Sequence, residues 1–122
     1  MAAKTLAERM RERRAFWVEL EPAADGKPPK RVQLLRPPET ELAAVRAGFK
    51  VEHVVAAAVA WEGFTEEDLL GAGVGSTDAA PFSPEAWREL VLDSAKFASQ
   101  AMGELTAAVV AHLEKVSQAS GN

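Results

Sequence analysis

Half of the aromatic side chains in this sequence surround one bend near its middle. Trp61, Phe64, Phe82 and Trp87 flank Gly63 and the loop that follows it. Elsewhere the chain is rich in alanine, with 24 in 122 residues, and holds four further aromatic residues. Large aromatic side chains dominate burial in small domains. We therefore expect these four to form a structural aromatic cluster in a core, a docking pocket for a partner being the alternative.

The length and the charge distribution set the first limits. A chain of 122 residues is long enough for a single core and one domain. Residues 1–50 carry 11 basic and 7 acidic side chains, net +4, whereas residues 51–122 carry 3 and 11, net −8. Such asymmetry suggests head-to-tail self-association or a charged partner. A mixed surface without a partner is the alternative.

Export and membrane insertion are not expected. The chain has no cysteine, which rules out disulfides and thiolate metal sites. The first residues carry charge where an export signal has its apolar region. The longest apolar run, over 54–61, is 8 residues, against roughly 20 needed to span a bilayer. We expect a cytoplasmic protein with no membrane partner.

The first half of the chain predicts a β-hairpin. Residues 16–20 and 30–35 are rich in β-favouring side chains and are separated by a break containing proline, aspartate and glycine. The apolar positions expected on its inner face are Phe16, Val18, Leu20, Val32 and Leu34. A lone hairpin is marginal in water, so helices or another chain must cover that face.

Two helices are expected after the hairpin. Residues 39–47 begin with acidic side chains and stop before Gly48, which is typical of a short helix. Residues 49–61 are ambiguous. Their valines favour a strand, whereas an apolar spacing close to 3.6 and three successive alanines favour a buried helix. We expect the helix.

The second half of the chain carries clear start signals for helices. Thr65 and Asp68 have the spacing of a capping box before a single helical turn. Ser83 followed by Pro84 predicts the start of another helix. A long amphipathic helix is expected from about residue 93 to 117.

Together these elements predict an α+β fold. An N-terminal antiparallel β-hairpin packs against about four α-helices, the longest of them at the C-terminus. Residues 1–13 are expected to form a basic, partly ordered arm, residues 14–117 a single domain, and residues 118–122 a disordered tail.

Side chains that catalyse or bind metals do not occur in productive patterns. The glycine-rich stretch 71–77 lacks the lysine of a phosphate-binding loop and follows a predicted helix instead of a strand. His53 and His112 stand alone. The carboxylates at 66–68 fall at a predicted helix start, where they favour the helix dipole. We therefore expect no enzyme, no catalytic residue, no cofactor and no metal.

The N-terminal arm is basic without resembling a nucleic-acid module. Four arginines between residues 9 and 14 alternate with glutamates, and the whole chain is acidic. A nucleic-acid partner is not expected, because its usual footprint is a basic domain with a recognisable fold. An acidic protein surface, such as the C-terminal half of a neighbouring copy, fits the pattern at least as well.

Three blocks resemble the small tail assembly chaperones of long-tailed bacteriophages, including versions found in prophages of GC-rich bacteria. The blocks are residues 30–39 (KRVQLLRPPE), 59–65 (VAWEGFT) and 81–87 (PFSPEAW), and a C-terminal helix follows them. The resemblance covers about residues 14–115, and each block is short.

This resemblance implies a non-enzymatic helper made in the cytoplasm of the bacterial host. Such a chaperone coats the tape-measure protein, recruits subunits of the major tail protein, and leaves before the virion is complete. No catalytic residue comes with the resemblance, and a homo-oligomer is expected. The alternative is a structural virion protein, namely a tail-tube, terminator or connector subunit.

The last predicted helix supplies the expected docking surface. A tape-measure protein is a long, largely helical, amphipathic chain, and a helper must cover its apolar surface reversibly. We expect partner binding or self-association through Phe97, Leu105, Val109 and Val116. Replacing Leu105 and Val109 with aspartate is then expected to abolish co-purification with the tape-measure protein.

Overall fold

The computed structural model describes residues 3–42 and 48–121. Within these ranges the chain forms an α+β fold, as the sequence predicts, with the longest helix at the C-terminus. In chain order the elements are α1 (Leu6–Glu12), β1 (Ala15–Glu21), β2 (Lys30–Leu35), α2 (Val51–Ala57), β3 (Ala58–Glu62), α3 (Glu66–Leu70), α4 (Pro84–Leu92) and α5 (Ala95–Gly121).

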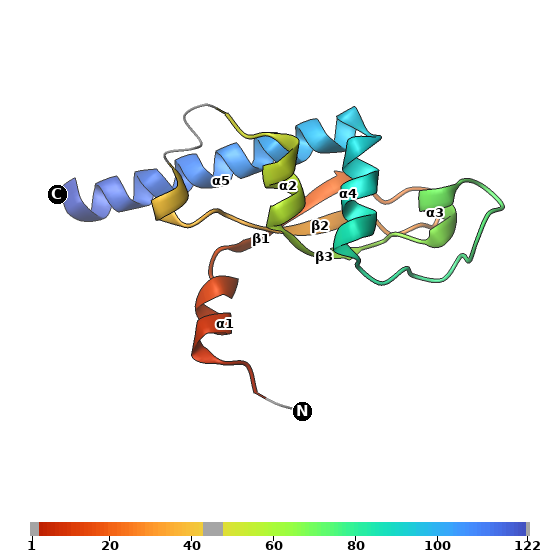
Figure 1. Cartoon of the computed structure of the whole chain (residues 1–122), viewed down its shortest axis with the longest axis horizontal. Coiled ribbons are helices and arrows are strands. Elements are labelled where there is room, and N and C mark those ends of the chain that lie inside the picture. Colours follow the sequence, from red (N-terminus) through yellow and green to blue (C-terminus); the bar gives the residue numbers. More distant parts are fainter. Residues whose placement is uncertain (1–2, 43–47, 122) are drawn as a thin grey trace.

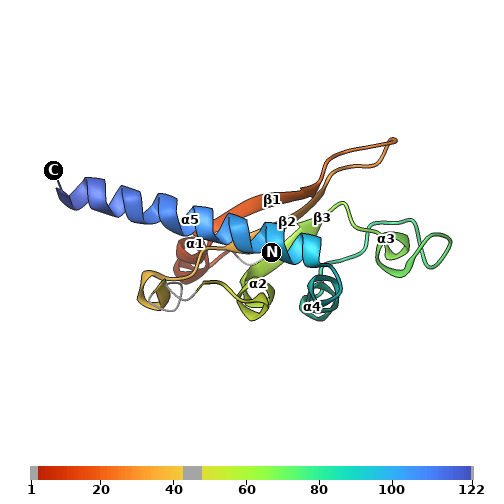
Figure 2. The same ribbon diagram turned by 90° about the horizontal axis from the view of Figure 1, so that it is seen from above.

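The strands form one antiparallel sheet in the order β1-β2-β3. Phe16 lies opposite Leu34, and Val18 lies opposite Val32, so the predicted hairpin and its apolar face are confirmed. Burial alternates along β1, which buries Val18 but exposes its neighbours. Helices α2, α4 and α5 all pack on the sheet, and they cover this one face (Figure 2).

A single core lies between the sheet and these helices. Its most completely buried large side chains are Trp87, Phe64, Leu34, Leu105, Val32 and Val54. The predicted aromatic cluster belongs to this core. The ring of Trp61 lies 4.7 Å from that of Phe64 and 5.4 Å from that of Phe82. Trp61, Phe64 and Trp87 are buried, whereas Phe82 packs against the core half-buried.

The prediction of a helix over residues 49–61 is wrong for the second half of that segment. Helix α2 ends at Ala57, and the chain continues directly as β3. There Trp61 pairs with Val32, and the spare residue Val59 makes a bulge. The free edge of β2 offered unpaired backbone groups, and residues of the valine and tryptophan type suit a strand beside it. The helical spacing describes only the first half of the segment.

The short helix expected over 39–47 is present in part. Residues 39–42 form a turn of 3₁₀ helix, and residues 43–47 lie outside the described residues.

The predicted helix starts later in the chain are confirmed. Ser83 Oγ accepts from the Ala86 N–H at 3.1 Å at the start of α4. Helix α5 begins at Ala95, two residues later than expected.

Both ends of the chain differ from the expected boundaries. The predicted disordered tail is helical, because α5 continues to Gly121; residue 122 lies outside the described residues. Helix α5 runs along the whole body, and its C-terminal half projects beyond the sheet (Figures 1 and 2). The predicted basic arm contains α1, which has no buried residue and projects from the body (Figure 1).

The capping box at the start of α3 contains a carboxylate, Asp68, whose ionisation makes the stability of the fold depend on pH. Thr65 Oγ1 accepts from the Asp68 N–H, and Asp68 Oδ2 accepts from the Thr65 N–H, each at 3.0 Å. Lys30 and Lys27 approach the Asp68 carboxylate at 3.6 and 3.8 Å. Burial on its own raises the pKa of Asp68, but the Thr65 hydrogen bonds and the two lysines lower it below its usual value overall.

Replacing Asp68 with asparagine is therefore expected to destabilise the fold at neutral pH by about 1 kcal/mol. Because the folded-state pKa is depressed, the carboxylate stabilises the fold above its unfolded pKa of about 3.9 and loses that effect as pH falls through the folded value. Denaturant unfolding of the parent and of Asp68→Asn should differ at pH 7 and converge in acid. Asp78→Asn, at an exposed position in the loop after α3, is the matched control. A parent–Asp68→Asn difference independent of pH would contradict this account.

Candidate functional site

The structure buries most of the residues expected to bind a partner. Phe97, Leu105 and Val109 are 8, 0 and 4% exposed, whereas Val116 is 38% exposed. Leu105 and Phe97 pack in the core, since that face of α5 lies on the sheet and on α2 and α4. In this fold the three buried side chains are not accessible for docking. Aspartate at Leu105 and Val109 would disrupt the fold, so those variants do not test partner binding.

The apolar stripe of α5 nevertheless continues past the core. His112, Val116 and Ala119 follow Val109 at intervals of three and four residues, on the same face of the helix. This part of α5 projects beyond the sheet (Figure 1). A helical face that is core in its first half is thus surface in its second half.

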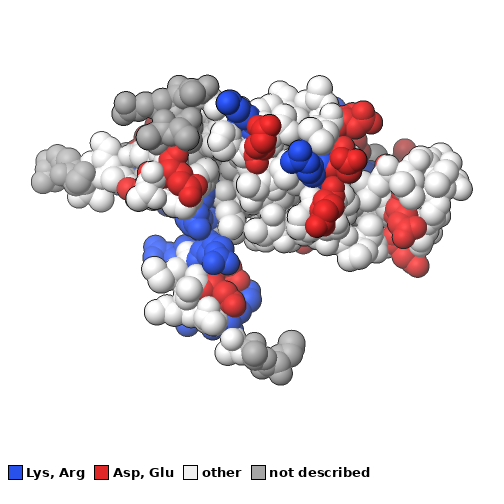
Figure 3. All heavy atoms as spheres, in the orientation of Figure 1, with Lys and Arg blue, Asp and Glu red and all other residues white. Residues whose placement is uncertain are grey.

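A groove lies where α1 approaches the C-terminal half of α5. We call it the basic groove, because five cationic side chains line it. They are Arg11, Arg13, Arg14, Arg36 and Lys115. Its apolar lining comes from Ala7, Met10, Pro38, Val116 and Ala119. No carboxylate among the described residues is part of this lining. In Figure 3, lysine and arginine gather on α1 and where α1 joins the body.

Two of these arginines are held together despite their like charges. Arg14 Nη1 donates to the carbonyl oxygen of Arg36 at 2.8 Å, and Arg36 Nη1 donates to the carbonyl oxygen of Pro37 at 2.7 Å. Burial, and then the nearby Arg14 cation, lower the pKa of Arg36, while Glu39 opposes the shift. Both guanidiniums remain charged at neutral pH. An anionic partner would relieve this repulsion, and the groove is therefore suited to carboxylates.

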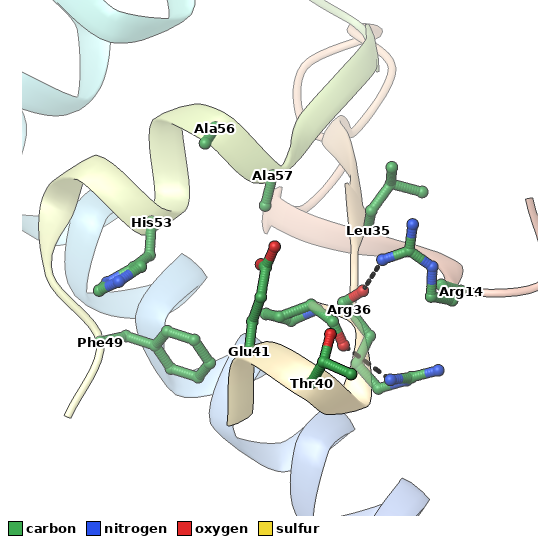
Figure 4. Close-up of a pocket in the computed structure, with 10 residues that line it drawn as sticks. Arg14, Leu35, Arg36, Thr40, Glu41, Phe49, His53, Ala56 and Ala57 are labelled. Atoms are coloured by element: carbon green, nitrogen blue, oxygen red, sulfur yellow. Dashed lines mark hydrogen bonds between the residues drawn. The ribbon is translucent and has the colours of Figure 1, made fainter. Parts of the chain in front are cut away.

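The same two arginines also line a second hollow. It has a volume of about 550 Å³ and lies between the end of β2, the turn at 39–42 and α2. Figure 4 shows Arg14 and Arg36 on one side of it and Phe49 and His53 on the other. His53 Nδ1 accepts from the Lys50 N–H at 2.8 Å, and its ring meets the Phe49 ring edge-on at 5.5 Å. These contacts give His53 a role in the start of α2.

His112 fixes one wall of the basic groove. Its Nε2 lies 2.9 Å from Glu39 Oε2, which ties α5 to the turn after β2. His112 itself is half-buried. The hydrogen bond holds α5 beside Pro38 and so positions this side of the groove.

The groove residues that the sequence analysis missed include Met10, Arg36 and Lys115, whereas Arg11 belongs to the arginines of the N-terminal arm that it singled out. Their signal was present as an excess of cations in the first 50 residues. What the sequence did not reveal is that α1, the turn after β2 and the end of α5 come together. An apolar floor lined by cations fits an amphipathic helix with carboxylates beside its apolar face.

Comparisons with known proteins found no match to this chain. No family model matches it, and neither the curated proteins nor the solved structures contain a match. In the described ranges, no three side chains of the metal-ligating types come together as a metal site. No helix in the described part of the chain combines the length and apolarity needed to cross a bilayer.

Proposed function

We propose that this protein is a non-enzymatic tail assembly chaperone of the long-tailed phage type, acting in the cytoplasm of the bacterial host. It binds a helical segment of the tape-measure protein and helps to recruit the major tail protein. Support comes from the resemblance of residues 30–39, 59–65 and 81–87 to that family. The basic groove adds a surface of the required kind.

The observation that carries the proposal is the continuation of the core stripe of α5 into the basic groove. Val109 is buried, and Val116 and Ala119, further along the same face, line the groove. A partner helix lying there would extend the packing of the domain with its own apolar side chains. Carboxylates beside that stripe would meet Arg11 and Lys115. Such binding covers apolar surface on a chain that would otherwise aggregate.

Reversing the charge of two groove residues is expected to abolish this binding. Arg11 and Lys115 are exposed on α1 and α5, and both line the groove. Charge reversal places like charges against the acidic partner, which we expect to weaken binding by at least about tenfold. The measurement is co-purification of a co-expressed tape-measure protein of a long-tailed phage with the tagged Arg11→Glu/Lys115→Glu double variant.

Arg88→Glu/Lys96→Glu is the matched control. Both residues are exposed, carry the same charges and lie outside the groove lining. Circular dichroism should show that both double variants fold like the parent. If the folded groove variant retains as much tape-measure protein as the control, this groove is not the binding site.

Mass spectrometry of purified virions separates the proposal from its alternative. A chaperone leaves the tail, so the chain should be nearly absent from mature particles. A tail-tube, terminator or connector subunit would remain in them in fixed numbers. Stoichiometric recovery from virions would reject the chaperone assignment.

A further inference from the structure

A second groove lies between α3 and α4, and its charge is the reverse of the first. We call it the acidic groove. Its polar lining consists of Glu66, Glu89 and Asp93, and no basic side chain among the described residues lines it. Leu70 and Leu92 also line it and are 62 and 55% exposed. Exposed leucines beside carboxylates form a surface suited to a basic amphipathic segment.

Two of these carboxylates are not neutralised by the protein itself. Glu66 Oε1 accepts from the Ser76 N–H at 3.1 Å and thereby holds the loop after α3. The side chains of Glu89 and Asp93 make no ion pair or hydrogen bond within the described ranges. Their charges therefore remain available to a partner.

Helix α1 has the complementary pattern. Leu6 and Met10 are 71 and 61% exposed, and Arg9 and Arg13 lie at intervals of three to seven residues from Leu6 on the same face. Neither arginine side chain forms an ion pair within the part of the chain that the structure describes. A helix of seven residues is marginal by itself, so packing of this face on another surface would stabilise it.

These two surfaces cannot meet within one molecule. Helix α1 is joined to β1 through residues 13 and 14, which span about 7 Å at most. Helices α3 and α4 line the acidic groove, and Figure 1 shows α3 at the end of the body that is far from α1. Figure 3 shows the same separation, with basic side chains on α1 and acidic ones over α3.

We infer that α1 of one molecule docks in the acidic groove of a second copy of this chain. Leu6 and Met10 pack against Leu70 and Leu92, while the two arginines face the carboxylates of α4. The contact joins two different surfaces, so a pair of molecules still has one α1 and one acidic groove unoccupied, and association continues from copy to copy. The interface uses neither Arg11 nor Lys115, but it shares Met10 and Arg13 with the basic groove. The Glu89→Lys/Asp93→Lys variant changes only the acidic groove, so it tests self-association separately from tape-measure binding.

Sedimentation of the whole chain at different salt concentrations tests this inference. At about 0.05 M NaCl the average mass of the parent should rise above the monomer mass of 13.1 kDa as the protein concentration rises. At about 0.5 M NaCl, screening should return it towards the monomer. Glu89→Lys/Asp93→Lys and Arg9→Glu/Arg13→Glu should each weaken self-association by at least about tenfold.

An equal mixture of the two double variants provides the decisive experiment. In each variant alone, α1 and the acidic groove now carry charges of the same sign. In the mixture, the groove with reversed charge in one variant meets the α1 with reversed charge in the other, so association should return. Glu104→Lys/Glu114→Lys changes the net charge as much as the groove variant, at exposed positions outside both grooves, and should associate like the parent. A monomeric parent at low salt, undiminished association of either folded reversal, or a mixture that stays monomeric would each overturn the inference.

Discussion

Replacing Trp87 with alanine is expected to lower the free energy of unfolding by about 3–5 kcal/mol. Trp87 is completely buried, and its indole Nε1 donates to the carbonyl oxygen of Val54 at 3.1 Å. That carbonyl belongs to the last turn of α2, where backbone acceptors lack helical partners. The substitution therefore opens a cavity and also leaves a buried acceptor without its donor. The loss is a large part of the roughly 5–15 kcal/mol typical of a whole domain.

Urea unfolding at neutral pH measures this loss, and Trp17→Ala is the matched control. Trp17 lies on the open face of the sheet, is 39% exposed, and carries the Arg31 guanidinium 4.8 Å from its ring centre. Losing this contact and partial burial should cost about 1 kcal/mol. Equal losses for the two tryptophans would show that α4 is not held to α2 as the structure indicates.

The second large effect is expected at Gly63, where alanine should strongly destabilise the fold. Gly63 has a φ of +86°, and a Cβ atom there would lie 2.1 Å from the carbonyl oxygen of Pro29 and 2.9 Å from its carbonyl carbon. Both contacts are with backbone, so no side chain can rotate away. Relief requires a shift between the end of β3 and the start of β2. We expect a cost of at least about 3 kcal/mol, from strain and overlap together.

Gly26→Ala separates these two causes. Gly26 has a similar φ of +76°, but a Cβ atom there would meet nothing within 4 Å. Alanine at position 26 should therefore cost only the conformational strain, about 1–2 kcal/mol. Thermal melting followed by circular dichroism measures both variants. If they melt alike, steric overlap with Pro29 is not what requires glycine at position 63.

The surfaces that we propose for binding other chains are the two grooves, which lie outside the central core. The blocks 59–65 and 81–87, which carry much of the family resemblance, contribute Trp61, Phe64 and Trp87 to that core. These two blocks therefore hold the helices and strands of the domain in place. The proposed contacts with other chains come from the outer surfaces of α1, α3 and α4 and from the end of α5.

Local signals in the sequence were sufficient for several elements. Ser83 with Pro84 marks the start of α4, and Thr65 with Asp68 marks the start of α3, because a cap depends on residues within one turn. The β1–β2 hairpin follows from alternation across a single loop. The single aromatic core was also predictable, since few large side chains were present to build it.

The partner surface was predictable only in part. The charge imbalance between the two halves of the chain was visible in the sequence, and the structure places some of those charges in separate grooves. The predicted docking residues Phe97, Leu105 and Val109 are core, because an apolar stripe has the same pattern whether a sheet or a partner covers it. Which half of α5 the sheet covers depends on where the sheet ends.

From the sequence alone came the α+β class, the hairpin, the helix starts and the aromatic core, all of which depend on contacts near in sequence or on composition. Tertiary structure decided that residues 58–62 form a strand, that α5 is half core and half surface, and that two oppositely charged grooves exist. Each of these outcomes depends on backbone edges and helix faces that are distant in sequence. Their pairing is settled by the packing of the whole domain, which no local pattern encodes.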